Sequence, residues 1–261
     1  MTVAKPHTTS YYAIRTLAMA SMLIDHIGVV FWPDAEMLRA VGRIAYPLYA
    51  FGIACGWMHT RNRQKYIWRL LLVALMAQVF WPLLTLGGVN VVAGFVAVLL
   101  WMSWAAPRIS AMTRTPPRVT DALAISVSWV CVCVASVLLG VDYAFETMVY
   151  VPLNCALLWL LRVHGRVPVW LPSLLYVVVS APFSDIVRLP LWAIALLAPA
   201  VVALHKEGGG APVLRESSPG GSVLSKAEGQ AVPAPWWFHH LYFWFYPAHL
   251  ALLYTVAAAI G

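Results

Sequence analysis

Charged residues are scarce in this sequence. Asp, Glu, Lys and Arg together make up 10% of its 261 residues, whereas 62% are hydrophobic. A water-soluble domain of this length needs more polar surface than that, which excludes a soluble globular protein. The long apolar runs instead indicate an integral membrane protein. Because the first run is long, has no A-x-A site and precedes equally apolar segments, we expect it to remain rather than be cleaved as a signal peptide.

Cysteine is also rare, and its pattern argues against metal chemistry. The four cysteines lie in apolar stretches, without the C-x-x-C pairs or clustered histidines that a zinc site would need. We therefore expect small buried side chains and no metal. No internal repeat of fixed period is found in the sequence, so the usual pointer to a repeat-built transporter is missing. The cysteines are Cys55, Cys131, Cys133 and Cys155.

Apolar runs separated by short polar breaks predict the fold class, an all-α polytopic membrane helix bundle. About nine transmembrane helices can be assigned, with eight as the alternative, and we expect them to form one domain, residues 1–261. The expected spans are 12–32, 37–57, 66–86, 89–106, 120–139, 145–161, 168–183, 186–204 and 236–258.

The net charge of +7 reports membrane topology rather than a nucleic-acid partner. Arg and Lys are concentrated in alternate breaks between the spans, and the positive-inside rule then puts the N-terminus in the cytoplasm. Nine spans would leave Gly261 on the outer side. Residues 206–235 are rich in Gly, Ser and Pro, which predicts a disordered cytoplasmic linker, with a partner-binding loop as the alternative.

The first span carries three ionisable residues, Arg15, Asp25 and His26. Polar groups at membrane depth cost several kcal/mol unless they are paired, so each is a candidate for function. Arg15 and His26 are eleven residues apart, which is within about 20° of three full turns, so they share one helical stripe roughly 16 Å long. This stripe suits a ligand that enters from the cytoplasm, with its anionic part on Arg15 and its reactive end near His26.

Asp25 points away from that stripe, so it does not form a dyad with His26 within one helix. The second span offers a cation at similar depth, Arg43, and an Asp25–Arg43 pair would lower the burial cost of both. Pro47 leaves the carbonyl oxygen of residue 43 without its helical donor. A purely structural clamp between Asp25 and Arg43 remains the alternative to a catalytic role.

The densest basic stretch, TRNRQKYIWRLL, follows the second span. Arg61, Lys65 and Arg69 recur every four residues and would form one helical face if the helix starts early. One interpretation is ordinary positive-inside residues beside anionic lipid headgroups. The other is a cradle for the phosphates of a polyanionic cofactor, which Arg contacts in pairs of hydrogen bonds. The candidate cofactor-binding residues here are Arg61, Arg63, Lys65, Tyr66 and Arg69.

Two further groups are candidates for substrate binding. In the last span Tyr246 and His249 lie deep beside Pro247, where a lone imidazole needs a partner, although a core histidine with one hydrogen bond is the commoner case. The second group, Asn90, Asp142 and Tyr143, falls near the outer ends of helices by topology and could line the same cavity.

Four motifs together resemble one family. The order DHIG, GRIAYPLYAF, TRNRQKYIWRLL and FYPAHLALLY is similar to the TraX family, membrane proteins associated with acetylation of conjugative pilin. The resemblance covers the first ~70 and last ~20 residues, and the middle is similar chiefly in hydropathy. Arg15 and His26 also resemble the R-x10-H signature of transmembrane acyltransferases that use coenzyme A.

The resemblance implies a membrane-bound acetyltransferase of the bacterial inner membrane. It would transfer acetyl from cytoplasmic acetyl-coenzyme A to the N-terminal amine of a pilin subunit. His26 would act as general base, and Arg43 would stabilise the oxyanion or hold Asp25. Proteins of a conjugation apparatus and membrane lipids would be further partners. Two alternatives stay open, a proton-coupled transporter and a non-catalytic factor for pilin maturation or assembly.

Overall fold

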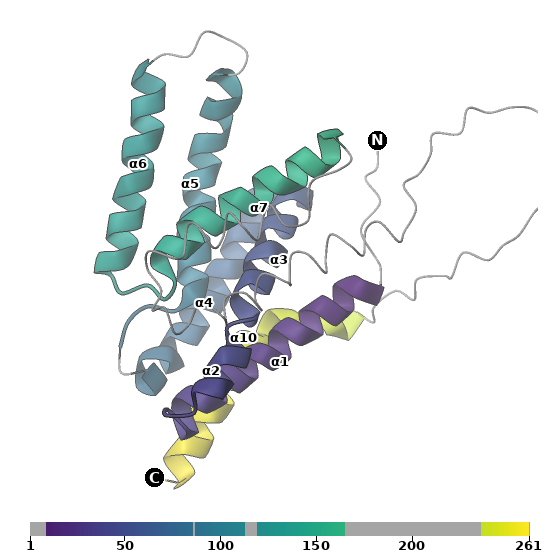
Figure 1. Cartoon of the computed structure of the whole chain (residues 1–261), viewed down its shortest axis with the longest axis vertical. Helices are drawn as coiled ribbons and strands as arrows, with labels where there is room; N and C mark the ends of the chain where they lie inside the picture. The colour runs from purple at the N-terminus through teal and green to yellow at the C-terminus, as the bar shows by residue number, and fades with distance from the viewer. Residues whose placement is uncertain (1–8, 86, 113–118, 165–235, 261) are drawn as a thin grey trace, which may run out of the picture.

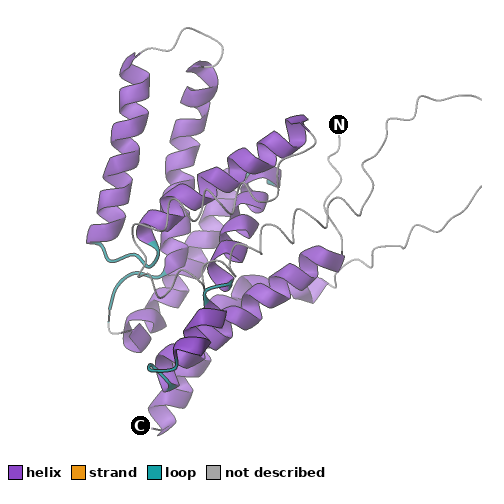
Figure 2. Ribbon diagram, viewed as in Figure 1, coloured by secondary structure: helices purple, strands orange, loops and turns teal. Residues whose placement is uncertain are grey.

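The structure, a computed structural model, describes residues 9–85, 87–112, 119–164 and 236–260. These residues form α-helices joined by turns (Figures 1 and 2), and their one β-type pairing is an isolated bridge between Val89 and Val141. The predicted all-α class is confirmed. The helices are α1 (Thr9–Phe31), α2 (Glu36–Gly42), α3 (Ala45–His59), α4 (Arg63–Thr85), α5 (Val91–Met112), α6 (Val119–Leu138), α7 (Ala144–His164) and α10 (Trp236–Ile260).

Five of the described helices, α1, α4, α5, α6 and α10, are long and apolar enough to cross a membrane. The protein is therefore a multi-pass membrane protein, as predicted. The spans expected at 168–183 and 186–204, and the linker expected at 206–235, lie outside the described residues.

The segment expected as a single span at 37–57 is two helices. α2 ends at Gly42 and α3 begins at Ala45, with Arg43 and Ile44 in a turn between them. Pro47 accounts for the break, because its ring nitrogen cannot donate to the carbonyl of residue 43 and its ring crowds that carbonyl. Gly42 lines the cavity described below, so this non-helical backbone borders a cavity rather than lipid.

α2 packs closely against the second half of α1, and Gly42 makes this approach possible. A Cβ atom at residue 42 would overlap the side chain of Asp25 and lie 2.6 Å from its Cα. Small residues at a helix crossing let two backbones approach, and here only glycine fits. The approach puts Arg39, the one cation of α2, beside the part of α1 that carries Asp25.

The centre of the bundle brings helices from both ends of the chain together. α10 packs against α1 and α4, and α7 packs against α3 and α5 in the neighbouring part of the bundle (Figure 1). α1 and α10 run in the same direction, because Arg15 contacts Tyr242 near the start of both helices and His26 contacts His249 further along. Buried core residues such as Phe95 fill the space between α3, α5 and α7.

α6 lies at the edge of the bundle (Figure 1). Val127, Val130, Val134 and Val137 on this helix are each at least 50% exposed. Lipid tails are as apolar as these side chains, so in a membrane this surface faces lipid without cost.

The turn before α5 is joined to the turn before α7. The backbone N–H of Val89 donates to the Gly140 carbonyl (2.9 Å), and the N–H of Asp142 donates to the Val89 carbonyl (2.8 Å). These bonds hold Asp142 and Tyr143 at the side of the bundle where α4 ends and α5 begins.

Candidate functional site

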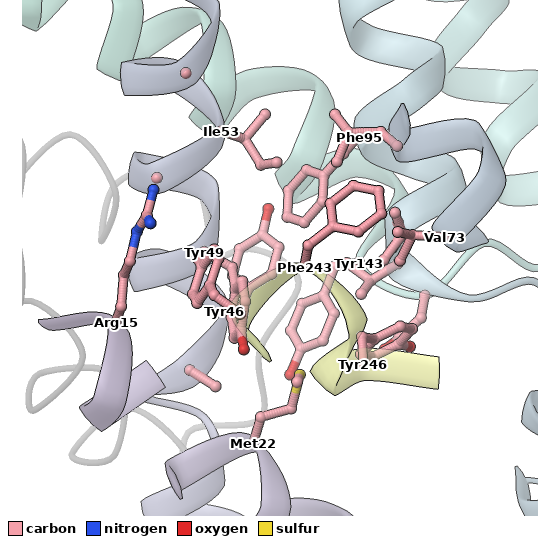
Figure 3. A pocket seen from close by; sticks show the side chains of 18 of the residues that line it. Arg15, Met22, Tyr46, Tyr49, Ile53, Val73, Phe95, Tyr143, Phe243 and Tyr246 are labelled. Carbon is pink, nitrogen blue, oxygen red and sulfur yellow. The ribbon is translucent and has the colours of Figure 1, made fainter. Parts of the chain in front are cut away.

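A cavity of about 260 Å³ lies among α1, α3, α4, α5 and α10 (Figure 3). It brings together residues that the sequence predicts for cofactor binding, catalysis and substrate binding. The predicted residues that line it are Arg15, Asp25, His26, Tyr66, Arg69, Asp142, Tyr143 and Tyr246. The predicted residues that are not part of its lining are Arg43, Arg61, Arg63, Lys65, Asn90 and His249.

Arg15 marks one end of the cavity. Its guanidinium lies over the ring of Tyr242, 4.5 Å from the ring centroid, and Tyr242 stacks on Tyr49 with a centroid separation of 5.5 Å. Figure 3 shows Arg15 and Tyr49 on the same side of the cavity. The Tyr66 hydroxyl donates to the Ile53 carbonyl (3.2 Å), which fixes a further aromatic ring in the lining. An aromatic ring holds a guanidinium in place and does not neutralise its charge, so this contact orients Arg15 at the cavity.

The rest of the basic stretch is only partly in the lining. α4 begins at Arg63, and Asn62 caps it by accepting the N–H of Lys65 (2.9 Å). The predicted common helical face is therefore wrong for Arg61, which precedes the helix. Arg61, Arg63 and Lys65 are exposed, and Arg63 packs over the ring of Trp57. Arg69, one turn further along than Lys65, reaches the cavity.

His26 contacts His249, and this pair is the most specific polar contact of the site. His26 Nδ1 and His249 Nε2 are 2.6 Å apart, although the two residues are 223 positions apart in the chain. Both side chains are buried, at 7% and 5% exposure. His249 Nδ1 is 2.7 Å from the backbone carbonyl of Phe245. His249 thus contacts the predicted general base and is not in the cavity lining itself.

Aromatic side chains surround the histidine pair. Trp81 lies edge-on to His26 with a centroid separation of 5.7 Å, and Tyr246 is 6.0 Å away. The Tyr246 hydroxyl is buried and has no hydrogen-bond partner among the described residues, and the same holds for Tyr49. A buried hydroxyl left without a partner costs about 1–3 kcal/mol. Since both tyrosines line the cavity, a polar ligand atom would remove that cost.

Asp25 forms its ion pair with Arg39 of α2, at 3.6 Å between Nε and Oδ1. The prediction that Asp25 contacts a cation of the next segment is thus correct, but the contact with Arg43 is wrong. The break before α3 turns Arg43 away and leaves Arg39, one helical turn earlier, against Asp25. The positive charge of Arg43 still acts on the Asp25 carboxylate.

Arg43 instead contacts Tyr143, which lines the cavity. Its guanidinium donates to the Tyr143 hydroxyl and lies 5.1 Å from that ring's centroid. Tyr143 stacks on Tyr46 with a centroid separation of 4.2 Å, and its backbone has φ 53°. Positive φ is uncommon for a bulky residue and needs surrounding contacts to hold it. The stack and the arginine supply those contacts, so Arg43 positions a wall of the cavity without lining it.

Asp142 lies in the turn between α6 and α7 and lines the cavity. Burial raises the pKa of its carboxyl from 3.8 to about 7, and the nearby positive charge of Arg43 opposes that rise. Asp142 therefore changes charge near neutral pH. Its placement agrees with the prediction that it lies on the same cavity as His26.

Asn90 has a structural role. Its side-chain amide donates to the Ala74 carbonyl (2.9 Å) and to Gln78 Oε1 (2.7 Å), and its Oδ1 accepts the N–H of Val92 (3.1 Å). These bonds cap α5 and tie it to α4. With its amide and its carbonyl oxygen both committed, Asn90 has little left to offer a substrate.

Several residues of the lining were not predicted. Tyr46 and Tyr49 lie on one face of α3, and Tyr242 lies one turn before Tyr246 on α10. The three- and four-residue spacing of these tyrosines was a usable signal, because it puts aromatic hydroxyls on one helical face. Arg39 gave no such signal, since the sequence pattern did not show that the helix breaks after it.

The arrangement can hold an anionic ligand at Arg15 and Arg69 and perform proton transfer at His26. Among the described residues no group of three or more His, Cys, Asp or Glu is placed to hold a metal ion. Fold and site together define a multi-pass helical membrane protein whose buried histidine pair faces a cavity with a basic end.

The chain belongs to the TraX family, because the model of that family, described as TraX protein, matches residues 10–257. The resemblance found in the sequence is thereby confirmed. The chain is similar to "Probable fimbrial assembly protein FimC, serogroup H1" of Dichelobacter nodosus, with 38% identity over 76 residues, which are 28% of this chain and 31% of the relative. It is also similar to "Uncharacterized protein RP591" of Rickettsia prowazekii (strain Madrid E), with 39% identity over 51 residues, 20% of this chain and 21% of the relative. The chain thus spans less than a third of either relative's length. No solved structure matches it significantly.

Proposed function

We propose that the protein is a membrane-bound acetyltransferase of the bacterial inner membrane. It transfers the acetyl group of acetyl-coenzyme A to the N-terminal amine of a pilin subunit. The observation that carries the proposal is the cavity that joins Arg15 and Arg69 to His26. Membership of the TraX family supports it, and the name of the Dichelobacter relative, a probable fimbrial assembly protein, supports a pilus-related acceptor.

The basic end of the cavity suits the polyanionic part of the cofactor. Arg15 and Arg69 line the cavity, and Arg61, Arg63 and Lys65 are exposed around the start of α4. Arginine forms paired hydrogen bonds to phosphate oxygens, so this group neutralises the nucleotide phosphates at the cytoplasmic surface. The uncharged thioester arm then lies along the tyrosine-lined cavity and brings the acetyl carbonyl to His26.

The chemistry is a direct transfer. His26 removes a proton from the acceptor amine as its nitrogen attacks the thioester carbonyl carbon. The new C–N bond forms, the C–S bond breaks, and the proton leaves with the thiol of coenzyme A. The buried Tyr246 hydroxyl donates to the oxyanion that forms on the carbonyl oxygen. Tyr246 takes this role in place of Arg43, which is not part of the lining.

The acceptor reaches His26 from the outer side. Asp25 and Asp142 line the cavity together with His26, and a carboxylate attracts an acceptor that arrives as an ammonium ion. The ammonium ion first gives one proton to such a carboxylate, and the neutral amine that results then attacks and gives its second proton to His26. α1 and α10 run in parallel, so both begin at one face and end at the other. Together with the positive-inside rule, this supports a cytoplasmic start and a periplasmic end for both helices.

The test uses the full chain in lipid vesicles with labelled acetyl-coenzyme A and a peptide that carries the pilin N-terminus. We expect acetyl-peptide in intact-mass spectra from the wild type and none from His26→Ala, with membrane insertion unchanged. Acetylation that persists in His26→Ala would overturn the assignment of the base.

A pilin assembly factor without catalysis is the second candidate, and the name of the Dichelobacter relative favours it. In the same vesicles this candidate predicts peptide binding with no acetyl-peptide. A transporter predicts flux across the vesicle membrane with no acetyl-peptide. Either result in the wild type would replace the acetyltransferase proposal.

A further inference from the structure

His26 and His249 meet edge to edge. Their ring planes differ by 6° and their centroids are 4.9 Å apart, a separation well beyond the ~3.5–4.0 Å of atoms in face-to-face contact. Two nitrogens 2.6 Å apart in rings whose centroids are 4.9 Å apart must be the atoms that face each other. An N–H lies in the plane of its ring, so near-parallel rings in this arrangement suit a directed hydrogen bond.

The partner of His249 determines which nitrogen carries the proton. His249 Nδ1 contacts the carbonyl oxygen of Phe245, and a carbonyl only accepts hydrogen bonds, so Nδ1 is protonated. In the neutral ring Nε2 is then the acceptor. Two nitrogens at 2.6 Å share one proton, so His26 Nδ1 donates to His249 Nε2.

We propose that His249 is a positioning residue that holds His26 in the tautomer with Nδ1 protonated and Nε2 free to accept a proton. The helix supplies this arrangement locally, because a side chain on α10 reaches back toward the carbonyl four residues earlier. Two consecutive hydrogen bonds, from His249 to the Phe245 carbonyl and from His26 to His249, fix the ring orientation of His26 and determine which of its nitrogens is basic. The remaining ring nitrogen of His26, Nε2, is then the one that can act on a ligand in the cavity that this residue lines. The inference rests on the proposed function only for its kinetic consequence.

Two substitutions at His249 test whether His26 needs a hydrogen-bond acceptor at the position of His249 Nε2. In His249→Gln the amide oxygen reaches about as far as Nε2 does, so it can still accept from His26. In His249→Asn the oxygen reaches only as far as Nδ1 and cannot. Thr255→Val, an exposed position on the same helix, is the control.

The readout that needs no activity is solid-state ¹⁵N NMR of the ring nitrogens, with the full chain in lipid bilayers. The resonances of His26 are assigned as those that disappear in His26→Ala. We expect Nδ1 protonated and Nε2 unprotonated in the wild type, in His249→Gln and in Thr255→Val. We expect a change of tautomer in His249→Asn. A wild-type His26 with unprotonated Nδ1, or an unchanged tautomer in His249→Asn, would overturn the proposal whatever the acetylation assay gives.

The kinetic readout is the split between kcat and KM. We expect His249→Asn to lower kcat about 100-fold, in the range of general-base effects, with KM for acetyl-coenzyme A within about twofold of wild type. His249→Gln should restore kcat to within about tenfold. Equal losses in both variants would mean that His249 serves folding alone. If the tautomer is as expected and the wild type transfers no acetyl group, the proposed function fails and the pairing stands.

Discussion

The site depends on a few polar atoms that the fold buries and aims at one cavity. His26 is oriented by His249, whereas the hydroxyls of Tyr49 and Tyr246 are buried without a hydrogen-bond partner among the described residues. Such groups are rare because each costs about 1–3 kcal/mol, and they persist where a ligand uses them. Tyr246 lies beside the histidine pair, so its hydroxyl is well placed to donate to the oxyanion that the proposed reaction forms next to His26.

At this scale we predict that Tyr246→Phe lowers kcat by about 100-fold and leaves KM for acetyl-coenzyme A nearly unchanged. The reason is that the hydroxyl acts on the oxyanion and not on the bound thioester. Steady-state kinetics in lipid vesicles measure both constants. Tyr254 is an exposed residue of α10 that does not line the cavity, and Tyr254→Phe should behave as wild type. An unchanged kcat in Tyr246→Phe would remove Tyr246 from the chemistry.

At the scale of helices, the break between α2 and α3 shapes the site. Pro47 ends the continuous helix, and Gly42 lets α2 approach α1 until it contacts Asp25. The consequence is that Arg39 pairs with Asp25 while Arg43 turns to Tyr143. Two cations four residues apart in the sequence thus brace two different walls of the cavity.

At this scale we predict that Gly42→Ala destabilises the protein by about 1–3 kcal/mol, because the added Cβ overlaps Asp25 and forces α2 from α1. The measurement is thermal unfolding in detergent, followed with a thiol-reactive dye. Cys133 and Cys155 are buried, so they report the loss of packing. Val41→Ala, at an exposed neighbouring position, should unfold at the wild-type temperature. Equal unfolding temperatures for Gly42→Ala and wild type would contradict the close approach.

At the scale of the whole molecule, the cavity connects a basic end with a histidine site across α1 and α10. The stripe from Arg15 to His26 on α1 is matched by Tyr242 and His249 on α10, which runs in the same direction. A ligand held along both helices spans much of the distance between the two faces. In the proposed function, this geometry lets acetyl-coenzyme A bind at one face and supply an acceptor that comes from the other.

At this scale we predict that Arg15→Gln and Arg69→Gln each weaken acetyl-coenzyme A binding about tenfold at low salt, the loss expected for one charged contact to phosphate. The loss should shrink at high salt, since salt screens the remaining attraction in the wild type. Titration calorimetry at two salt concentrations measures both effects.

The controls for this prediction are cations outside the cavity. Arg108→Gln removes an exposed arginine that packs over Trp104, and Arg61→Gln removes one that precedes α4. We expect no effect from the first and a smaller one from the second than from Arg69→Gln. Equal effects of all four substitutions would mean that the basic residues act only through net charge and membrane topology.

The sequence by itself determined the membrane class, the family and the stripe from Arg15 to His26. The membrane class follows from composition and the stripe from helical periodicity, and both are present within single segments. The family follows from the resemblance of four short motifs. The tertiary structure alone decided which partners meet: Arg39 rather than Arg43 on Asp25, and His249 on His26. Such contacts depend on where a helix breaks and on which distant helices pack together. No single segment determines these contacts. The cost of burial predicts that a buried charge has a partner, but it does not predict which residue that partner is.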